Sequence, residues 1–236
     1  MCIRDRSNTV TNSGTFTLDN SSLGELIVNG QLTITGLDAD SAATIDANGL
    51  DDRVFRVFGN DNVFNNITIT GGNNTSDTFG GGAILLSTGE LELNRVVITD
   101  NFANNLGGGV RANGLLVANT STFSFNQTSG DGGAISSSAG LEFAAVTINN
   151  NDALGGDGGG IHIGNNGGTL INVTLSGNMA SQDGGGLKAN SGNVVITSTT
   201  VTDNTADRGG GINNSCLLYT SPSPRDATLS RMPSSA

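Results

Sequence analysis

Apolar and polar residues alternate with a period of two in short segments along most of the chain. Leu91-Glu92-Leu93, Val146-Thr147-Ile148, Ile161-His162-Ile163 and Val173-Thr174-Leu175 all show this alternation. It is the spacing of a β-strand with one buried face, and it differs from the spacing of an amphipathic helix. Glycine and asparagine separate the segments and break the chain into short pieces. The pattern therefore predicts many short strands with no helix between them.

Glycine clusters punctuate the chain at nearly constant intervals. Each cluster holds two or three glycines and leads into an apolar residue, and the clusters are 24 to 27 residues apart. The final glycines of the six clusters are Gly82, Gly109, Gly133, Gly160, Gly186 and Gly211. Glycine adopts positive φ without strain and lets neighbouring backbones approach closely. We therefore expect each cluster to form a bend, with the following apolar residue pointing inward.

A second motif, an apolar residue followed three positions later by asparagine, keeps the same phase. Its apolar residue follows each of the first five glycine clusters by 14 to 16 residues. Gly72 stands where an earlier asparagine would fall, so we expect a ladder of stacked amides that starts at the first member. Its predicted members are Asn101, Asn126, Asn151, Asn178 and Asn204.

Two motifs that hold one register over five cycles predict a solenoid. Short parallel strands that stack from turn to turn, with no helices, are typical of a β-helix. Because parallel connections are right-handed by default, the predicted fold class is all-β, a right-handed parallel β-helix with about 25 residues per turn. Residues 7–215 would then make about eight turns.

The predicted solenoid has a regular and an irregular part. Residues 80–215 carry the glycine-cluster and apolar-x-x-Asn repeats, whereas residues 7–79 form irregular N-terminal turns with longer bends. Within the irregular part, the segments 32–36 and 67–71 read Leu-Thr-Ile-Thr-Gly and Ile-Thr-Ile-Thr-Gly. We interpret them as equivalent strands.

The two ends of the chain differ in composition from the rest. Residues 1–6 and 216–236 hold both cysteines, all three prolines and the only tyrosine, but no glycine. Codons exist for which the reverse complement of the DNA encoding residues 1–5 lies inside the DNA encoding residues 216–221. We therefore interpret both ends as translated sequencing adapter, exclude them from the fold, and expect 216–236 to be disordered.

Charge and composition narrow the function classes. Residues 7–215 hold 19 acidic and 6 basic residues, a net charge of −13, so no nucleic-acid partner is expected. This segment contains no cysteine, and it therefore gives no sign of disulfides. It also lacks a run of about 20 apolar residues. Membrane attachment would therefore need an anchor outside this sequence.

The motifs resemble a known repeat family. Gly-Gly-Ala-Ile at 81–84 and 132–135, with Phe-x-x-Asn at 123–126, resembles the repeats of polymorphic outer-membrane proteins, which are autotransporter passengers. The wider pattern is similar to right-handed β-helix proteins of the pectin-lyase-like fold. The resemblance implies a fragment of a secreted or surface-displayed (outer-membrane) bacterial protein with a stalk or adhesin role. The implied partners are a carbohydrate, a host or neighbouring cell surface, and flanking repeats of the same chain.

An enzyme on the same fold is the alternative, as a polysaccharide lyase or hydrolase. Such enzymes need clustered basic and carboxylate groups on one face. The one dense charge group, Arg53 and Arg56 beside Asp51 and Asp52, is expected to be a solvated bend with exposed ion pairs. His162 is the only histidine and is expected to face outward into solvent. We therefore assign no catalytic, cofactor-binding or metal-binding residue.

A column of acidic residues is the remaining candidate site. Asp131, Asp157 and Asp183 each directly precede a glycine cluster, and Arg208 takes that place in the next turn. Stacked carboxylates repel one another unless a cation bridges them, so calcium is one hypothesis. The other is that aspartate favours bends and accepts hydrogen bonds from the backbone there. Apart from this calcium hypothesis, no cofactor is expected.

Overall fold

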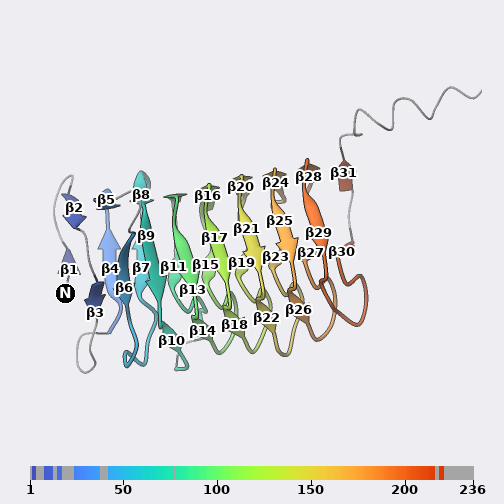
Figure 1. The fold of residues 1–236 in the computed structure, drawn as a ribbon, viewed down its shortest axis with the longest axis horizontal. Helices are drawn as coiled ribbons and strands as arrows, with labels where there is room; N and C mark the ends of the chain where they lie inside the picture. Colours follow the sequence, from blue (N-terminus) through green and yellow to red (C-terminus); the bar gives the residue numbers. More distant parts are fainter. Residues whose placement is uncertain are drawn as a thin grey trace, which may run out of the picture.

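The computed structural model describes residues 2–3, 8–12, 15–17, 24–37, 42–76, 78–215 and 218–220. These residues form an all-β, all-parallel solenoid of about 7 turns, with about 26 residues per turn (Figure 1). The predicted all-β parallel solenoid is thus confirmed, while its right-handed sense stays a prediction. None of the described residues belongs to a helix of the length and apolarity that crossing a membrane requires.

Four parallel sheets run along the long axis of the solenoid. Sheet A consists of β1 (Cys2–Ile3), β4 (Leu26–Asn29), β7 (Phe55–Phe58), β11 (Ile84–Leu86), β15 (Val110–Ala112), β19 (Ile135–Ser137), β23 (Ile161–Ile163), β27 (Leu187–Ala189) and β30 (Ile212–Asn214). Sheet B consists of β2 (Asn8–Asn12), β5 (Leu32–Gly36), β8 (Asn62–Asn65), β12 (Glu90–Asn94), β16 (Leu115–Asn119), β20 (Leu141–Ala144), β24 (Gly168–Ile171), β28 (Val194–Thr197) and β31 (Leu218–Thr220).

The chain passes from sheet B to sheet C, then to the shorter sheet D, and back to sheet A one turn further on. Sheet C consists of β3 (Thr15–Thr17), β6 (Ala43–Asp46), β9 (Ile67–Thr70), β13 (Val97–Thr99), β17 (Thr122–Ser124), β21 (Thr147–Asn149), β25 (Thr174–Ser176) and β29 (Thr200–Thr202). Sheet D consists of β10 (Asn73–Asn74), β14 (Phe102–Ala103), β18 (Gln127–Thr128), β22 (Asp152–Ala153) and β26 (Met179–Ala180).

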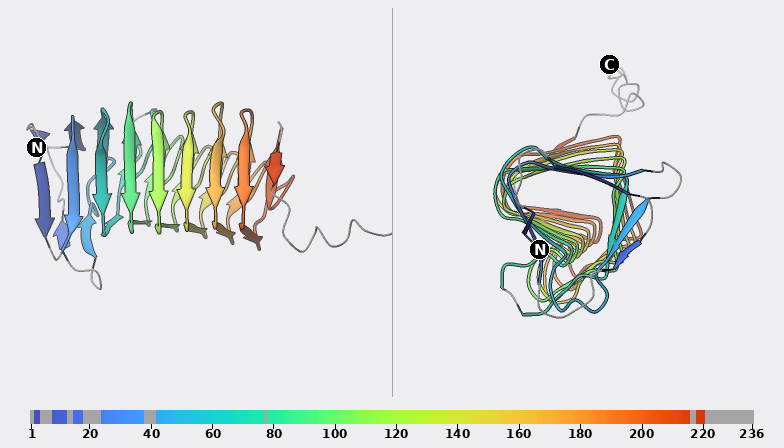
Figure 2. Two further views of the ribbon diagram at one scale, coloured as in Figure 1. Left: turned by 90° about the horizontal axis from the view of Figure 1, so that it is seen from above. Right: turned by 90° about the vertical axis from the view of Figure 1, so that its left-hand side faces the viewer.

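The core is a set of apolar columns inside the rod. A large apolar residue one or two positions after each glycine cluster points inward and pairs in register with its equivalents in the neighbouring turns. Ile84, Val110, Ile135, Ile161 and Leu187 form one such column and are fully buried. In the end-on view of Figure 2 successive turns lie behind one another with a small, steady offset. The side chains of this column therefore pack on other apolar side chains above and below them.

The early turns differ from the prediction in two ways. Ile27, Arg56 and Leu85 are in register at intervals of 29 residues, so these turns are longer and the total is about 7 rather than eight. The proposed equivalence of segments 32–36 and 67–71 is wrong. β5 pairs with β8 in sheet B, whereas β9 pairs with β6 and β13 in sheet C. The same alternating pattern suits both sheets, because each buries one face.

The glycine clusters form the bends that the sequence predicts. Gly107, the first glycine of its cluster, has a φ of 65°, and a Cβ atom there would lie 2.1 Å from the carbonyl oxygen of Val110. The next residue, Gly108, is equally constrained, because its Cβ would lie 2.3 Å from the carbonyl oxygen of Gly133 in the next turn. Both the bend and the close stacking of turns thus exclude a side chain.

The asparagine ladder is confirmed in full. Each amide nitrogen of the first four members donates to the side-chain oxygen of the next member, at 2.9 to 3.0 Å. The ladder runs through Asn101, Asn126, Asn151, Asn178 and Asn204. Each amide also donates to a strand carbonyl of an earlier turn, and Gly72 donates its peptide N–H to Asn101 at the start. The first four members are buried, so the ladder satisfies polar groups that water does not reach.

A second, outward ladder on sheet B was not predicted. Asn94 donates its amide to Asn65, and Asn119 donates to Asn94, both at 3.0 Å. These residues end β8, β12 and β16 in register. The ladder stops at Ala144, which occupies the position in β20. It adds side-chain ties between neighbouring turns on the solvent side.

Both segments interpreted as adapter contain residues placed in strands. β1 pairs with β4, and β31 pairs with β28. The expected disorder of residues 216–236 falls largely outside the described residues. Of this segment, the structure describes only the three residues of β31.

Phe125 occupies a left-handed bend that is unfavourable for a bulky residue. Its φ is 54°, whereas the equivalent positions one turn earlier and later hold Asp100 and Asn150 with φ of 55°. The ring is 57% exposed, so little packing offsets the strain. We expect Phe125→Asn to raise the free energy of unfolding by about 0.5–1 kcal/mol, since asparagine tolerates this conformation.

Urea unfolding followed by circular dichroism measures this change. The matched control is Thr122→Asn, which lies in the same turn at an ordinary strand position and is expected to lower stability slightly. A Phe125→Asn variant less stable than the parent chain would show that the ring contributes packing that outweighs the strain.

Candidate functional site

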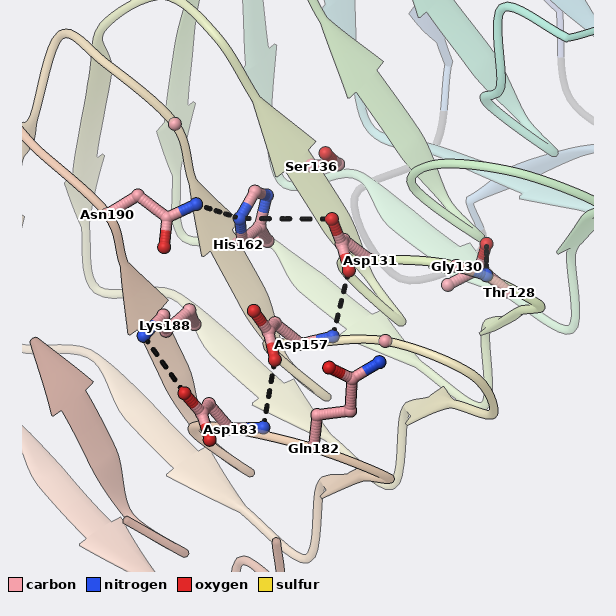
Figure 3. Close-up of polar contacts among 12 residues, drawn as sticks. Thr128, Gly130, Asp131, Ser136, Asp157, His162, Gln182, Asp183, Lys188 and Asn190 are labelled. Atoms are coloured by element: carbon pink, nitrogen blue, oxygen red, sulfur yellow. Dashed lines mark hydrogen bonds and ion pairs between the residues drawn. The ribbon is translucent and has the colours of Figure 1, made fainter. Parts of the chain in front are cut away.

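Charged and polar side chains gather on the outward face of sheet A. Arg111, Ser136, His162 and Lys188 occupy the middle positions of β15, β19, β23 and β27, and the pairing places them in one column. They alternate with inward residues, yet Ser136, His162 and Lys188 are buried. The loops that lead from sheet D into sheet A lie against them and carry the aspartate column, as Figure 3 shows. We call these four residues and Asp131, Asp157 and Asp183 the polar cluster.

The aspartate column is held by the backbone of the following turn. One carboxylate oxygen of Asp131 accepts the peptide N–H of Asp157 at 2.9 Å, and Asp157 accepts that of Asp183 at the same distance (Figure 3). A peptide dipole thus lies between successive carboxylates and offsets their repulsion. This arrangement agrees with the interpretation of these aspartates as bend residues that accept backbone hydrogen bonds.

Asp183 ends the column between two cations. Its carboxylate lies 3.2 Å from the Lys188 ammonium and 2.7 Å from Arg208 Nε. Burial alone would raise the pKa of the Asp183 carboxyl, but the hydrogen bonds from Lys188 and Arg208 outweigh this effect and lower it below its ordinary value. Arg208, which replaces aspartate in the next turn, therefore closes the column with the opposite charge.

His162 is buried, which corrects the expectation that it is solvated. Its Nε2 lies 3.0 Å from the Asn190 amide nitrogen and 4.0 Å from an Asp131 oxygen, and these side chains cover it. Nδ1 has no hydrogen-bond partner among the described residues. Burial lowers the pKa of the imidazole, and the nearby carboxylates of Asp131 and Asp157 only partly oppose this. His162 is therefore neutral at neutral pH.

This burial predicts a loss of stability in mild acid. Because the folded-state pKa of His162 lies below its unfolded value, the unfolded chain takes up the proton first, and stability falls as pH drops through the folded pKa. We expect the melting temperature of the parent chain to fall more than that of His162→Gln between about pH 7 and pH 5. The glutamine variant retains the carboxylates, so its own decline is the control. Parallel declines would contradict the prediction.

Lys188 is fixed by three acceptors. Its ammonium contacts Asp183 at 3.2 Å, Asn213 at 2.9 Å and Ser215 at 3.2 Å. An ammonium has three N–H donors, so these contacts use all of them. Arg111 similarly donates to the Ser136 hydroxyl at 2.8 Å. The polar cluster therefore ties neighbouring turns together. The Lys188 ammonium and the Ser136 hydroxyl are both hydrogen-bonded to other residues of the chain.

The expectation of a solvated bend at Arg53 and Arg56 is wrong. Arg53 is only 1% exposed; it forms an ion pair with Glu25 and donates to the Gly80 carbonyl at 2.5 Å. Arg56 lies 3.5 Å from the same carboxylate and stacks over the rings of Phe58 and Phe79. The Asp52 carboxylate also lies 3.9 Å from Arg53 Nε, but the closer partner, Glu25, belongs to the preceding turn and is distant in sequence. This second cluster links two turns, with Arg53 buried and the Arg56 side chain 30% exposed.

No set of three or more histidine, cysteine, aspartate or glutamate side chains among the described residues is placed to hold a metal ion. Comparisons of the chain with known protein families, with curated proteins and with solved structures found no match. A function for the chain is therefore inferred from its own structure and its own repeat motifs.

Proposed function

We propose that the chain is a segment of a secreted or surface-displayed bacterial β-helix protein that acts as a stalk or adhesin. The observation that carries the proposal is the unbroken asparagine ladder, which joins five successive turns through buried amides. Hydrogen bonds and ion pairs parallel to the long axis suit a rod that transmits force. Export and the autotransporter role rest on the resemblance of the repeats, whereas the interpretation of both ends as adapter rests on their composition and on the codons that can encode them.

Localisation is the first test of this proposal. Antibodies raised against the purified chain would be applied to intact and to permeabilised cells of the bacterium that supplied the DNA. The proposal predicts equal labelling of both samples, because the epitopes lie outside the cell. Labelling confined to permeabilised cells would overturn it. Long-read sequencing across both ends of the reading frame tests the adapter interpretation, which fails if the genome encodes residues 216–236.

A carbohydrate-active enzyme is the second candidate, and the polar cluster is the observation that favours it. A neutral imidazole beside Asp131 and an ammonium beside Asp183 occupy one face of one sheet. The ties of Lys188 to three acceptors count against it as a free base. Incubation of the chain with pectate, alginate and xylan separates the candidates. New reducing ends or unsaturated products, lost in Lys188→Ala, would favour the enzyme.

The proposed stalk needs no resident calcium. One oxygen of Asp131 and one of Asp157 already accept peptide N–H bonds, while calcium requires about six to eight oxygen ligands. We therefore expect the melting temperature to be the same with saturating calcium and with a chelator. A rise with calcium that Asp157→Asn abolishes would assign the aspartate column to the ion instead.

A further inference from the structure

The outward face of sheet C, from β9 onward, is a regular array in which ten of twelve side chains are threonine or serine. In six consecutive strands, β9, β13, β17, β21, β25 and β29, one outward residue lies on each side of an inward residue, and among these outward residues Ser124 is only 7% exposed. We call these twelve residues the threonine face: Thr68, Thr70, Val97, Thr99, Thr122, Ser124, Thr147, Asn149, Thr174, Ser176, Thr200 and Thr202. The strands lie side by side along the rod in Figure 1.

The side chains of the threonine face are separated by two fixed spacings, one between neighbouring strands and one along each strand. Parallel pairing sets neighbouring strands about 4.7–4.9 Å apart, and outward residues two apart on one strand are separated by about 6.6 Å. The pairing keeps this net in register from Thr68 to Thr200 without a slip. The oxygen atoms on the prism face of ordinary ice form a rectangular net of similar dimensions, with one repeat slightly shorter and the other slightly longer.

The side chains of this face are restricted in conformation. One column, from Thr68 to Thr200, is β-branched at every position, so each χ1 is stiff and each presents a methyl group. In the other column Ser124 donates to the Thr99 hydroxyl at 3.2 Å, and Thr99 donates to Asp100 at 2.7 Å. Little side-chain freedom is therefore lost when an ordered surface binds.

The absence of charged side chains on the threonine face indicates what kind of surface it can bind. The chain carries a net charge of −11, yet none of the twelve residues of the threonine face is ionisable. On sheet B, by contrast, Glu92 and Glu142 lie in one outward column. A face that alternates methyl and hydroxyl groups and carries no charge fits a neutral ordered lattice of hydrogen-bonding oxygens.

We propose that the threonine face binds ice, with its hydroxyl and methyl groups ordering water in the register of the crystal. The methyl groups hold the first water layer in a cage while the hydroxyl groups anchor it by hydrogen bonds. The binding is a property of the sheet C surface, and it does not depend on the stalk role. Because the lattice is periodic, contact grows with each added turn.

The test compares matched variants of the full chain. Thr174→Lys places a long charged side chain within the threonine face, on the fifth of its six strands, whereas Thr169→Lys makes the same change on the outward face of sheet B in the same turn. Thermal hysteresis, inhibition of ice recrystallisation and partitioning of fluorescently labelled chain into a growing ice crystal are the readouts. Circular dichroism melting confirms that each variant is folded.

We expect the parent chain and Thr169→Lys to enter ice and shape its crystals, and the activity of Thr174→Lys to fall at least about tenfold. Thr147→Lys and Glu142→Lys repeat the comparison one turn earlier, should Thr174→Lys unfold. A parent chain that does not enter ice would overturn the proposal. Equal activity of the two lysine variants would also overturn it, as would binding to crystalline chitin or to a second copy of the chain in place of ice.

Discussion

Replacing Leu175 by aspartate is expected to unfold the turns of the solenoid on either side of β25. Leu175 is fully buried in β25, between Ile148 of β21 and Val201 of β29. An unpaired carboxylate there would lose its hydration without gaining a partner, and the leucine packing would be lost as well. We expect the free energy of unfolding to fall by at least about 4 kcal/mol, a large part of the total stability of an ordinary domain.

The adjacent residue supplies the control for this change. Thr174 lies on the same strand but faces outward, so Thr174→Asp should change stability by no more than about 1 kcal/mol. Urea unfolding monitored by circular dichroism compares the two variants under the same conditions. Similar stability of Leu175→Asp and Thr174→Asp would show that the inward and outward assignments of sheet C are wrong.

Replacing Asn151 by alanine is expected to interrupt the asparagine ladder at its centre. The Asn151 oxygen accepts from both the peptide nitrogen and the amide nitrogen of Asn126, and its amide donates to Phe123 and Asn178. Alanine leaves several of these buried groups without partners, at about 1–3 kcal/mol for each group that stays unpaired. We expect a total loss of about 3–6 kcal/mol.

Asn149 provides the matched control, because it lies two residues earlier, at the end of β21, with its side chain facing outward. Asn149→Ala should change stability by no more than about 0.5 kcal/mol. Hydrogen exchange of the two variants should show faster exchange on both sides of the interrupted rung only in Asn151→Ala. Equal protection in both variants would mean that the ladder contributes little to stability.

The regular part of the fold was predictable because its determinants repeat. The bends need glycine at fixed positions such as Gly107, and the ladder needs an asparagine once per turn, so both leave a periodic signal. The outward ladder of Asn65, Asn94 and Asn119 carried the same kind of signal at a spacing of one turn. It could therefore have been found by comparing polar positions as well as apolar ones.

The polar cluster was only partly predictable. The aspartate column was visible in the sequence, because each member precedes a glycine cluster. The burial of His162 was not visible, because it depends on Asn190 and Asp131, which come from the neighbouring turns. Alternation gives the side of the sheet on which a residue lies, but the path of a loop from another turn decides whether water reaches it.

The early turns were the hardest part of the fold to predict from the sequence, for a similar reason. Their longer bends break the period, so segments of similar sequence in sheets B and C looked equivalent. The pairing of Glu25 with Arg53 likewise joins residues of different turns without a repeated motif. A periodic sequence pattern locates contacts that repeat in each turn, but it gives no information about contacts that occur only once.

Single-molecule pulling on the two ends of the chain tests most directly the claim that stacked, side-chain-tied turns form a continuous rod. The account predicts resistance followed by stepwise lengthening, with each step releasing one turn and adding roughly 90 Å of extended chain. It also predicts that Asn151→Ala lowers the force of the central steps while Asn149→Ala does not. Smooth extension at low force without steps, or identical traces for both variants, would contradict the account.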